Sequence, residues 1–164
     1  MKVEHHPNHR KPRFPHPFQE WLNPAGCVPV DNIDYGGFGV LAFADSPFLQ
    51  MTMDTGNVFI AGEDPVRFLA RFLKRVGHVH LKDVAPRLSE TARGTQTGIG
   101  MSHCSLGEGV NAQNIRRCLE LLRDRGFQGA VSLECEAQGG PVLERSILWI
   151  RQVLQELEIA SDLT

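Results

Sequence analysis

The sequence predicts an α/β fold in which parallel strands alternate with helices. Alternating or continuous apolar residues, typical of strands, occur at residues 49–54, 76–81 and 130–134. Between and after these segments, apolar residues recur every three or four positions, as in amphipathic helices. Strands and helices in alternation imply parallel strands that are joined by helical crossovers.

The first clear strand, residues 49–54, ends on an acid, Asp54. Asp64 and Pro65 then open a helix, because aspartate is a good N-cap and proline suits the first helical position. The helix is expected over 64–75, with an apolar face formed by Leu69, Phe72, Leu73 and Val76.

A strand over 76–81 follows, and then a loop rich in glycine, serine and threonine that reaches Gly109. The second helix, over 113–125, has Ile115, Cys118, Leu119 and Leu122 on one side, and glycines end it before the strand 130–134. The closing helix, over 141–157, is expected to bury Leu143, Ile147, Ile150, Leu154 and Leu157.

The chain is expected to form a single domain, residues 1–164, with an irregular opening over 1–47 and βα units over 48–157. Prolines prevent a continuous helix in the opening, which predicts a short strand around residues 2–4 followed by a long loop. Three glycines interrupt any pattern within residues 25–47, so that segment stays ambiguous.

Composition excludes several classes of protein. Apolar residues make up 41% of the 164 residues and charged residues 22%, which is typical of globular domains. A net charge of −2 gives no electrostatic case for binding nucleic acid or anionic lipid. The chain has neither the ~18 apolar residues in a row that span a bilayer nor an apolar export signal at its start. We therefore expect a soluble, cytoplasmic domain with no nucleic-acid or membrane partner.

The spacing of the cysteines is also consistent with a cytoplasmic domain. They are widely separated and form neither a C-x-x-C pair nor a zinc-ribbon spacing. We expect them to be reduced thiols packed as small apolar residues: Cys27, Cys104, Cys118 and Cys135.

Four chemically active side chains lie at or near the C-terminal ends of predicted strands: Glu4, Asp54, His80 and Glu134. In parallel α/β sheets and barrels this is where active sites form. Three carboxylates would repel one another unless a cation held them together. An oxygen-rich set with one nitrogen suits Mn²⁺, Mg²⁺, Co²⁺ or Zn²⁺.

Each of these residues also has a purely structural interpretation. Asp54 precedes Thr-Gly-Asn and could form a turn, and His80 could be a hydrogen-bonded polar group. Glu134 is less easily explained, because an inward carboxylate after an apolar run is unfavourable unless it is paired. The joint occurrence on separate strands favours a shared site.

Four stretches occur in an order that resembles the xylose-isomerase-like TIM-barrel superfamily of sugar-phosphate isomerases and epimerases, which also includes endonuclease IV. They are MDTGN (53–57), HVHLKD (78–83), LGEG (106–109) and SLE (132–134). The resemblance implies a parallel (β/α) barrel of the TIM type. It also implies one divalent metal ion, with Mn²⁺ the first choice, held by Glu4, Asp54, His80 and Glu134.

The implied reaction is isomerisation or epimerisation of a small sugar or sugar-phosphate-like substrate through an enediolate. Two carboxylates beside the substrate can serve as base and acid. By resemblance to the keto-sugar epimerases, Glu4 and Glu134 take these catalytic roles. The substrate-binding candidates are His6, Asn57, Lys82 and His103.

Two residues that depart from the superfamily pattern reduce the number of functions that the resemblance implies. Asn57 replaces a histidine that epimerases and endonuclease IV usually have, and Met101 stands where endonuclease IV has an acid beside its zinc histidine. Both changes argue against a three-zinc nuclease. His103 and Lys82 could contact substrate or be solvated loop residues.

The chain is shorter than the about 250 residues of a complete TIM barrel. We expect a barrel truncated to about its last five units, and a homo-oligomer could cover the open strand edges. The alternative function is therefore a non-catalytic barrel remnant that serves as an interaction module.

Overall fold

The computed structural model describes residues 50–94, 100–135 and 140–160. Strands and helices alternate along this part of the chain. In order they are β1 (Met51–Asp54), α3 (Thr55–Ile60), α4 (Pro65–Phe72), the 3₁₀ turn η1 (Leu73–Arg75), β2 (Val76–Leu81), α5 (Pro86–Ala92), α6 (Ala112–Asp124), β3 (Ala130–Leu133) and α7 (Pro141–Glu156).

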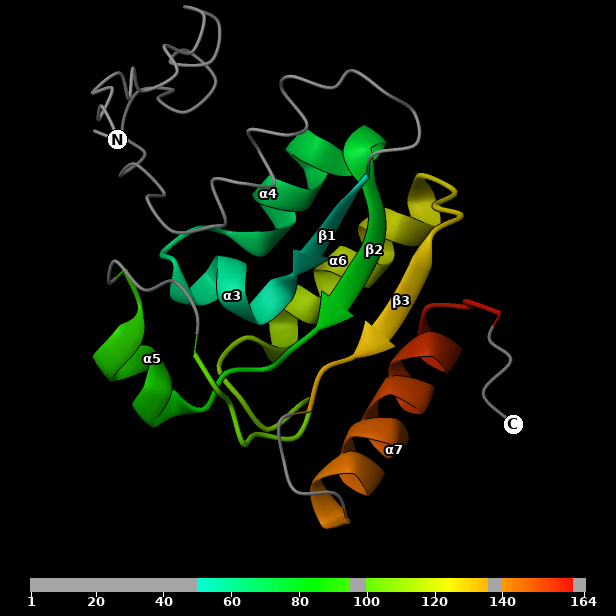
Figure 1. Ribbon diagram of the computed structural model, residues 1–164. Helices are drawn as coiled ribbons and strands as arrows, with labels where there is room; N and C mark the ends of the chain where they lie inside the picture. Colours follow the sequence, from blue (N-terminus) through cyan, green and yellow to red (C-terminus); the bar gives the residue numbers. More distant parts are fainter. Residues whose placement is uncertain (1–49, 95–99, 136–139, 161–164) are drawn as a thin grey trace, which may run out of the picture.

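The strands form one parallel sheet in the order β1-β2-β3. Figure 1 shows the three arrows pointing the same way, with α6 behind the sheet. The register pairs Asp54 with His80, and His80 with Ser132. The predicted α/β alternation with parallel strands is confirmed, and the three strands of the described ranges do not close into a barrel.

The predicted elements agree closely with the observed ones. Strand β2 has the expected bounds, and β1 and β3 differ from expectation by one or two residues at an end. The helices predicted over 113–125 and 141–157 correspond to α6 and α7. The helix expected over 64–75 is α4 continued by η1, with Asp64 as its N-cap and Pro65 in its first turn.

Two short helices were not predicted. The segment between residue 81 and Gly109 was expected to be a loop, and that expectation is wrong where α5 begins at Pro86. None of the residues of α5 is buried, so the sequence carries no apolar stripe to reveal it. Helix α3 begins directly after β1 and uses Asp54 as its N-cap.

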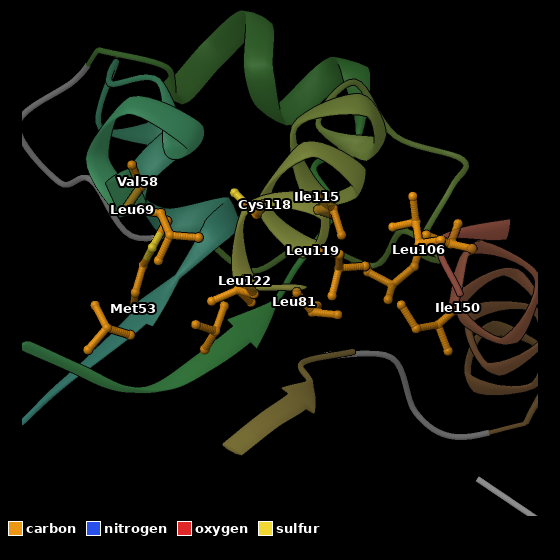
Figure 2. Close-up of a cluster of buried hydrophobic side chains, with 14 residues drawn as sticks. Met53, Val58, Leu69, Leu81, Leu106, Ile115, Cys118, Leu119, Leu122 and Ile150 are labelled. Carbon is orange, nitrogen blue, oxygen red and sulfur yellow. The ribbon is translucent and has the colours of Figure 1, made fainter. Parts of the chain in front are cut away.

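The hydrophobic core lies between one face of the sheet and the helices. Met53, Val79 and Leu81 supply the strand side, and α6 contributes its predicted apolar face. Figure 2 shows the labelled side chains of α6 between Leu69 from α4 and Ile150 from α7, with Met53 and Leu81 on the strand side. Cys118 is fully buried within this cluster, as expected for a thiol used as a small apolar residue.

The buried face of α7 is rotated from the expected one. Leu143 is 41% exposed, so its predicted burial is wrong, whereas Ile150 and Leu157 are buried as expected. The buried stripe begins with Ser146, whose hydroxyl accepts a hydrogen bond from the Leu106 backbone and donates one to the Val142 carbonyl. A serine with backbone partners thus takes an inward position that an apolar pattern does not predict. In the described ranges, no helix has both the length and the apolarity that crossing a membrane requires.

The second face of the sheet is polar. Because successive side chains of a strand point to opposite faces, His78 and His80 lie opposite Val79 and Leu81. His78 Nε2 is 2.9 Å from Ser132 Oγ, and the two histidine rings are in edge contact with centroids 4.5 Å apart. This polar face is the one that leads to the candidate site. The expected homo-oligomer stays a prediction.

Candidate metal centre

Three of the predicted metal ligands meet at the C-terminal ends of the strands. Asp54 ends β1 and is paired in register with His80 on β2. Glu134 follows β3, and its backbone N–H donates to the Leu81 carbonyl at 3.0 Å, which continues the sheet to this residue. Adjacent strands lie about 4.8 Å apart, so side chains on one face of neighbouring strands converge. One ligand atom from each of Asp54, His80 and Glu134 lies within 4.8 Å of the other two.

Each oxygen of Glu134 has its own partner. Oε2 lies 2.6 Å from His80 Nδ1, and Oε1 accepts a hydrogen bond from Lys82 Nζ at 3.1 Å. The Glu134 carboxyl also shares a hydrogen bond with Asp54. The carboxyl group is therefore oriented from both sides and faces the other two candidate ligands.

Asp54 is both a helix cap and a candidate ligand. Its Oδ1 accepts the Asn57 backbone N–H at 2.7 Å, and its Oδ2 accepts the Asn57 side-chain amide at 3.1 Å. The turn-forming interpretation and the ligand interpretation of Asp54 are therefore compatible. Asn57, predicted to bind substrate, is the residue that orients this carboxylate.

The two carboxyl groups titrate as a pair. Burial and the hydrogen bond with Glu134 raise the pKa of Asp54 to about 7. Burial alone would raise the pKa of Glu134, but hydrogen bonds with Asp54, His80 and Lys82 outweigh it and lower the pKa to about 2. At neutral pH the pair therefore carries a shared proton only part of the time, and when bound this proton offsets part of the negative charge of the pair.

This donor set fits a divalent cation. Two carboxylates and an imidazole are ligands that Mn²⁺, Zn²⁺ and related ions accept. A cation bound between these residues would take the place of the shared proton and offset the negative charge of the two carboxylates. Asp54, His80 and Glu134 are the described residues that would hold it. Glu4, the fourth predicted ligand, and His6 lie outside the described residues.

The remaining predicted site residues differ in their surroundings. Lys82 is only 1% exposed, and its Nζ lies against the carboxylates rather than in solvent. This contact places the ammonium group of Lys82 on the same side of the sheet as His80 and Glu134. His103 is exposed on the segment before Gly107.

Sequence reasoning did not identify Asp83, which organises the loop beside the site. Its two carboxylate oxygens accept four backbone hydrogen bonds of 2.8–3.0 Å, from Val84, Gly107, Gly109 and Asn111. Burial raises the pKa of this carboxyl group, and the four backbone donors oppose that shift. The LGEG stretch is thereby tied to the end of β2. The sequence feature that could have indicated this role is an acid just after a predicted strand, together with the two glycines of the LGEG stretch, Gly107 and Gly109.

Gly109 has no room for a side chain. A Cβ atom there would lie 2.3 Å from Asp83 Oδ1 and 2.5 Å from the Val84 carbonyl oxygen, closer than real contacts allow. The glycine therefore permits the backbone N–H to reach the carboxylate, which explains why this position of the LGEG stretch carries no side chain.

Buried polar contacts also join α3, β2 and α6 below the site. Thr55 Oγ1 donates to the Lys82 carbonyl at 3.1 Å and accepts from the Lys82 N–H at 3.0 Å. Asn111, the N-cap of α6, donates its side-chain amide to the carbonyls of Thr55 and Lys82, both at 3.1 Å. The ends of these three elements are therefore held at fixed positions around Lys82.

Two thiols should react slowly in the folded protein. Burial, with the charges of Asp83 and Glu108, raises the pKa of Cys104 to about 11, and burial raises that of Cys118 to about 12. Because the thiolate is the nucleophile, we expect iodoacetamide at pH 8 to label both at least about 100-fold more slowly than in urea. Peptide mass spectrometry after timed labelling measures these rates. Equal rates in the folded and unfolded protein would contradict the prediction.

Comparison with known proteins places this site in a family. A sequence profile described as xylose isomerase-like TIM barrel matches residues 30–153, a range that contains Asp54, His80 and Glu134. The chain belongs to this family. The resemblance inferred from the four sequence stretches is thereby confirmed.

Within the xylose isomerase-like family, several curated relatives that match the chain are named inosose dehydratase. The protein from Mesomycoplasma hyopneumoniae (strain 7448) is 32% identical over 101 residues, which cover 59% of this chain and 34% of the relative. The protein from Clostridium botulinum (strain Eklund 17B / Type B) is 23% identical over a match of the same coverage. The protein from Clostridium beijerinckii is 24% identical over 114 residues, which cover 68% of this chain and 37% of the relative. The xylose isomerase-like chain thus spans about a third of the length of these relatives.

Proposed function

We propose that this chain carries the metal centre of a divalent-metal-dependent isomerase or epimerase that acts on a small sugar or sugar-phosphate-like substrate. The observation that carries the proposal is the convergence of Asp54, His80 and Glu134 at the C-terminal ends of three parallel strands. Membership of the xylose isomerase-like family supports a sugar or polyol as the class of substrate. Mn²⁺ is the first choice of metal.

The reaction begins with removal of a proton next to a carbonyl group. A divalent cation held by Asp54, His80 and Glu134 would supply Lewis-acid stabilisation of the negative charge that develops on the substrate oxygens. Glu134 is the proposed acceptor of this proton, and the hydrogen bonds that lower its pKa keep it ionised at neutral pH. Return of that proton to the neighbouring carbon gives an isomer, and return to the opposite face of the same carbon gives an epimer.

The other described residues hold the carboxylates in place. Asn57 binds both oxygens of Asp54, and His80 and Lys82 bind one oxygen each of Glu134. Fixed donors keep the reacting groups within the narrow range of positions that proton transfer requires. Glu4 remains the proposed second acid/base group.

Dehydration of a keto-polyol is a second candidate reaction, and the relatives named inosose dehydratase favour it. It begins with the same removal of a proton next to a carbonyl. The electron pair of the enediolate then forms a double bond to the adjacent carbon and expels the hydroxyl group there, which takes a proton from the general acid and leaves as water. The same base and the same cation therefore serve both candidate reactions.

Solvent deuterium incorporation tests the proposal and separates the two reactions. The full chain is freed of metal with EDTA, reloaded with Mn²⁺ and incubated in D₂O with a panel of ketoses and inososes. We expect proton NMR to show loss of the signal at the carbon next to the carbonyl with Mn²⁺ and not with EDTA. A deuterated sugar isomer indicates isomerase or epimerase activity, whereas loss of water indicates dehydratase activity.

Direct metal binding provides the control that does not depend on the substrate. Calorimetric titration with MnCl₂ should show one site per chain, and His80→Ala should weaken binding at least about tenfold because one ligand is lost. A chain that binds no Mn²⁺, Mg²⁺, Co²⁺ or Zn²⁺ would contradict the proposal and favour the non-catalytic remnant.

A further inference from the structure

A buried lysine lies against the carboxylates of the proposed metal site. Lys82 Nζ is 3.1 Å from Glu134 Oε1 and 3.9 Å from Asp54 Oδ2, and it donates to Asn57 Oδ1 at 3.5 Å. Its side chain is 1% exposed, although the side chain of Glu134 is 31% exposed. A buried ammonium group is unfavourable unless anions compensate it, so the contacts with the carboxylates account for its position.

The backbone provides a specific place for the lysine stem. A Cβ atom on Gly56 would lie 2.6 Å from Lys82 Cγ and 2.8 Å from Lys82 Cδ. The absence of a side chain at this position lets the stem pass over the start of α3 toward the carboxylates. Thr55 and Asn111 hold the Lys82 backbone at the same point. The ammonium group is therefore placed by the fold and is not a chance surface contact.

We propose that Lys82 is a built-in counter-cation of the metal site, which holds Asp54 and Glu134 together without metal and competes electrostatically with the metal. This inference rests on the proposed function, because it concerns the same site. Lys82 acts through the carboxylates, so it is a positioning residue. When both carboxylates are ionised they carry two negative charges, of which the lysine offsets one.

The contacts of Lys82 predict that its ammonium group lowers the affinity of the site for a metal ion. Removal of the ammonium group leaves Glu134 Oε2 beside His80, and both oxygens of Asp54 remain bound by Asn57. The ligands therefore keep their main anchors, while one positive charge close to the cation disappears. Like charges a few ångströms apart in a partly buried site repel strongly, since solvent screens them poorly.

The test compares the full chain with its Lys82→Met variant, which keeps most of the length of the stem and removes the charge. We expect K82M to bind Mn²⁺ at least about tenfold more tightly by calorimetric titration. Without metal, K82M should melt at a lower temperature than the unchanged chain, because the carboxylates lose their counter-cation. Saturating Mn²⁺ should raise the melting temperature of K82M more than that of the unchanged chain.

A matched lysine provides the control. Lys74 lies on η1 and is not buried, so Lys74→Met should change neither Mn²⁺ affinity nor the metal-dependent rise in melting temperature. A folded K82M that binds Mn²⁺ equally or more weakly would overturn the inference. If K82M does not fold with or without Mn²⁺, Lys82→Gln is judged by the same affinity criterion. An unchanged chain that binds no metal would instead contradict the proposed function.

Discussion

Asp83→Ala should destabilise the folded chain severely. The side chain is 1% exposed and accepts four backbone hydrogen bonds, from Val84, Gly107, Gly109 and Asn111. Its removal leaves four backbone N–H groups without their acceptor, two of them in buried and two in partly buried hydrogen bonds. Because each unsatisfied buried donor costs about 1–3 kcal/mol, we expect the free energy of unfolding to fall by about 4 kcal/mol or more. For a domain of this size that is a fall of roughly 10 °C in Tm.

An exposed aspartate provides the control for Asp83→Ala. The side chain of Asp124 is 59% exposed and pairs only with its neighbour Arg123 among the described ion pairs. Asp124→Ala should change the free energy of unfolding by less than about 0.5 kcal/mol. Urea unfolding of both variants, followed by circular dichroism, measures the difference. If Asp83→Ala unfolds at the same urea concentration as Asp124→Ala, the loop is held by other contacts.

Glu134→Gln should nearly abolish the proposed activity while the fold is retained. The amide keeps the size of the side chain, but it removes a negative charge and the group that accepts the substrate proton. Loss of a general acid or base lowers rates by ~10²-fold or more, and we expect at least that loss in the deuterium-incorporation assay. The neutral amide is also a weaker metal ligand, so Mn²⁺ affinity should fall in the same variant.

The matched control for this change is Glu144→Gln on the exposed side of α7. It removes the same charge from the same chain away from the strand ends. Both variants should show the circular dichroism spectrum of the unchanged chain. Full activity in Glu134→Gln, with Mn²⁺ bound, would show that another group removes the proton.

The secondary structure was most predictable where burial alone decides it. Strand β2 has the predicted bounds because Val79 and Leu81 face the core while His78 and His80 face away from it. Helix α6 has a continuous apolar stripe, and its ends were predicted to within about a residue. Helix α5 has no buried residue, so its only signal was Pro86 at its start, and this was not sufficient.

The residue types of the site could be predicted from the sequence, but the hydrogen bonds and packing contacts among them could not. Acids and a histidine at the ends of separate strands indicate a shared site, because parallel strands bring their C-terminal ends to one edge. The role of Asp83 could not be read in the same way, since its partners are backbone N–H groups, which every sequence contains. The burial of Lys82 depends on Gly56, which is 26 positions away in the sequence.

The contact between Gly56 and Lys82 restricts which substitutions could accumulate during evolution. An alanine at position 56 would collide with the part of the lysine side chain nearest the backbone, which cannot swing aside as the tip could. A lysine in this buried position therefore fits only when position 56 is glycine. The residues at positions 56 and 82 are therefore expected to change together, since a side chain at position 56 requires a shorter or differently placed side chain at position 82.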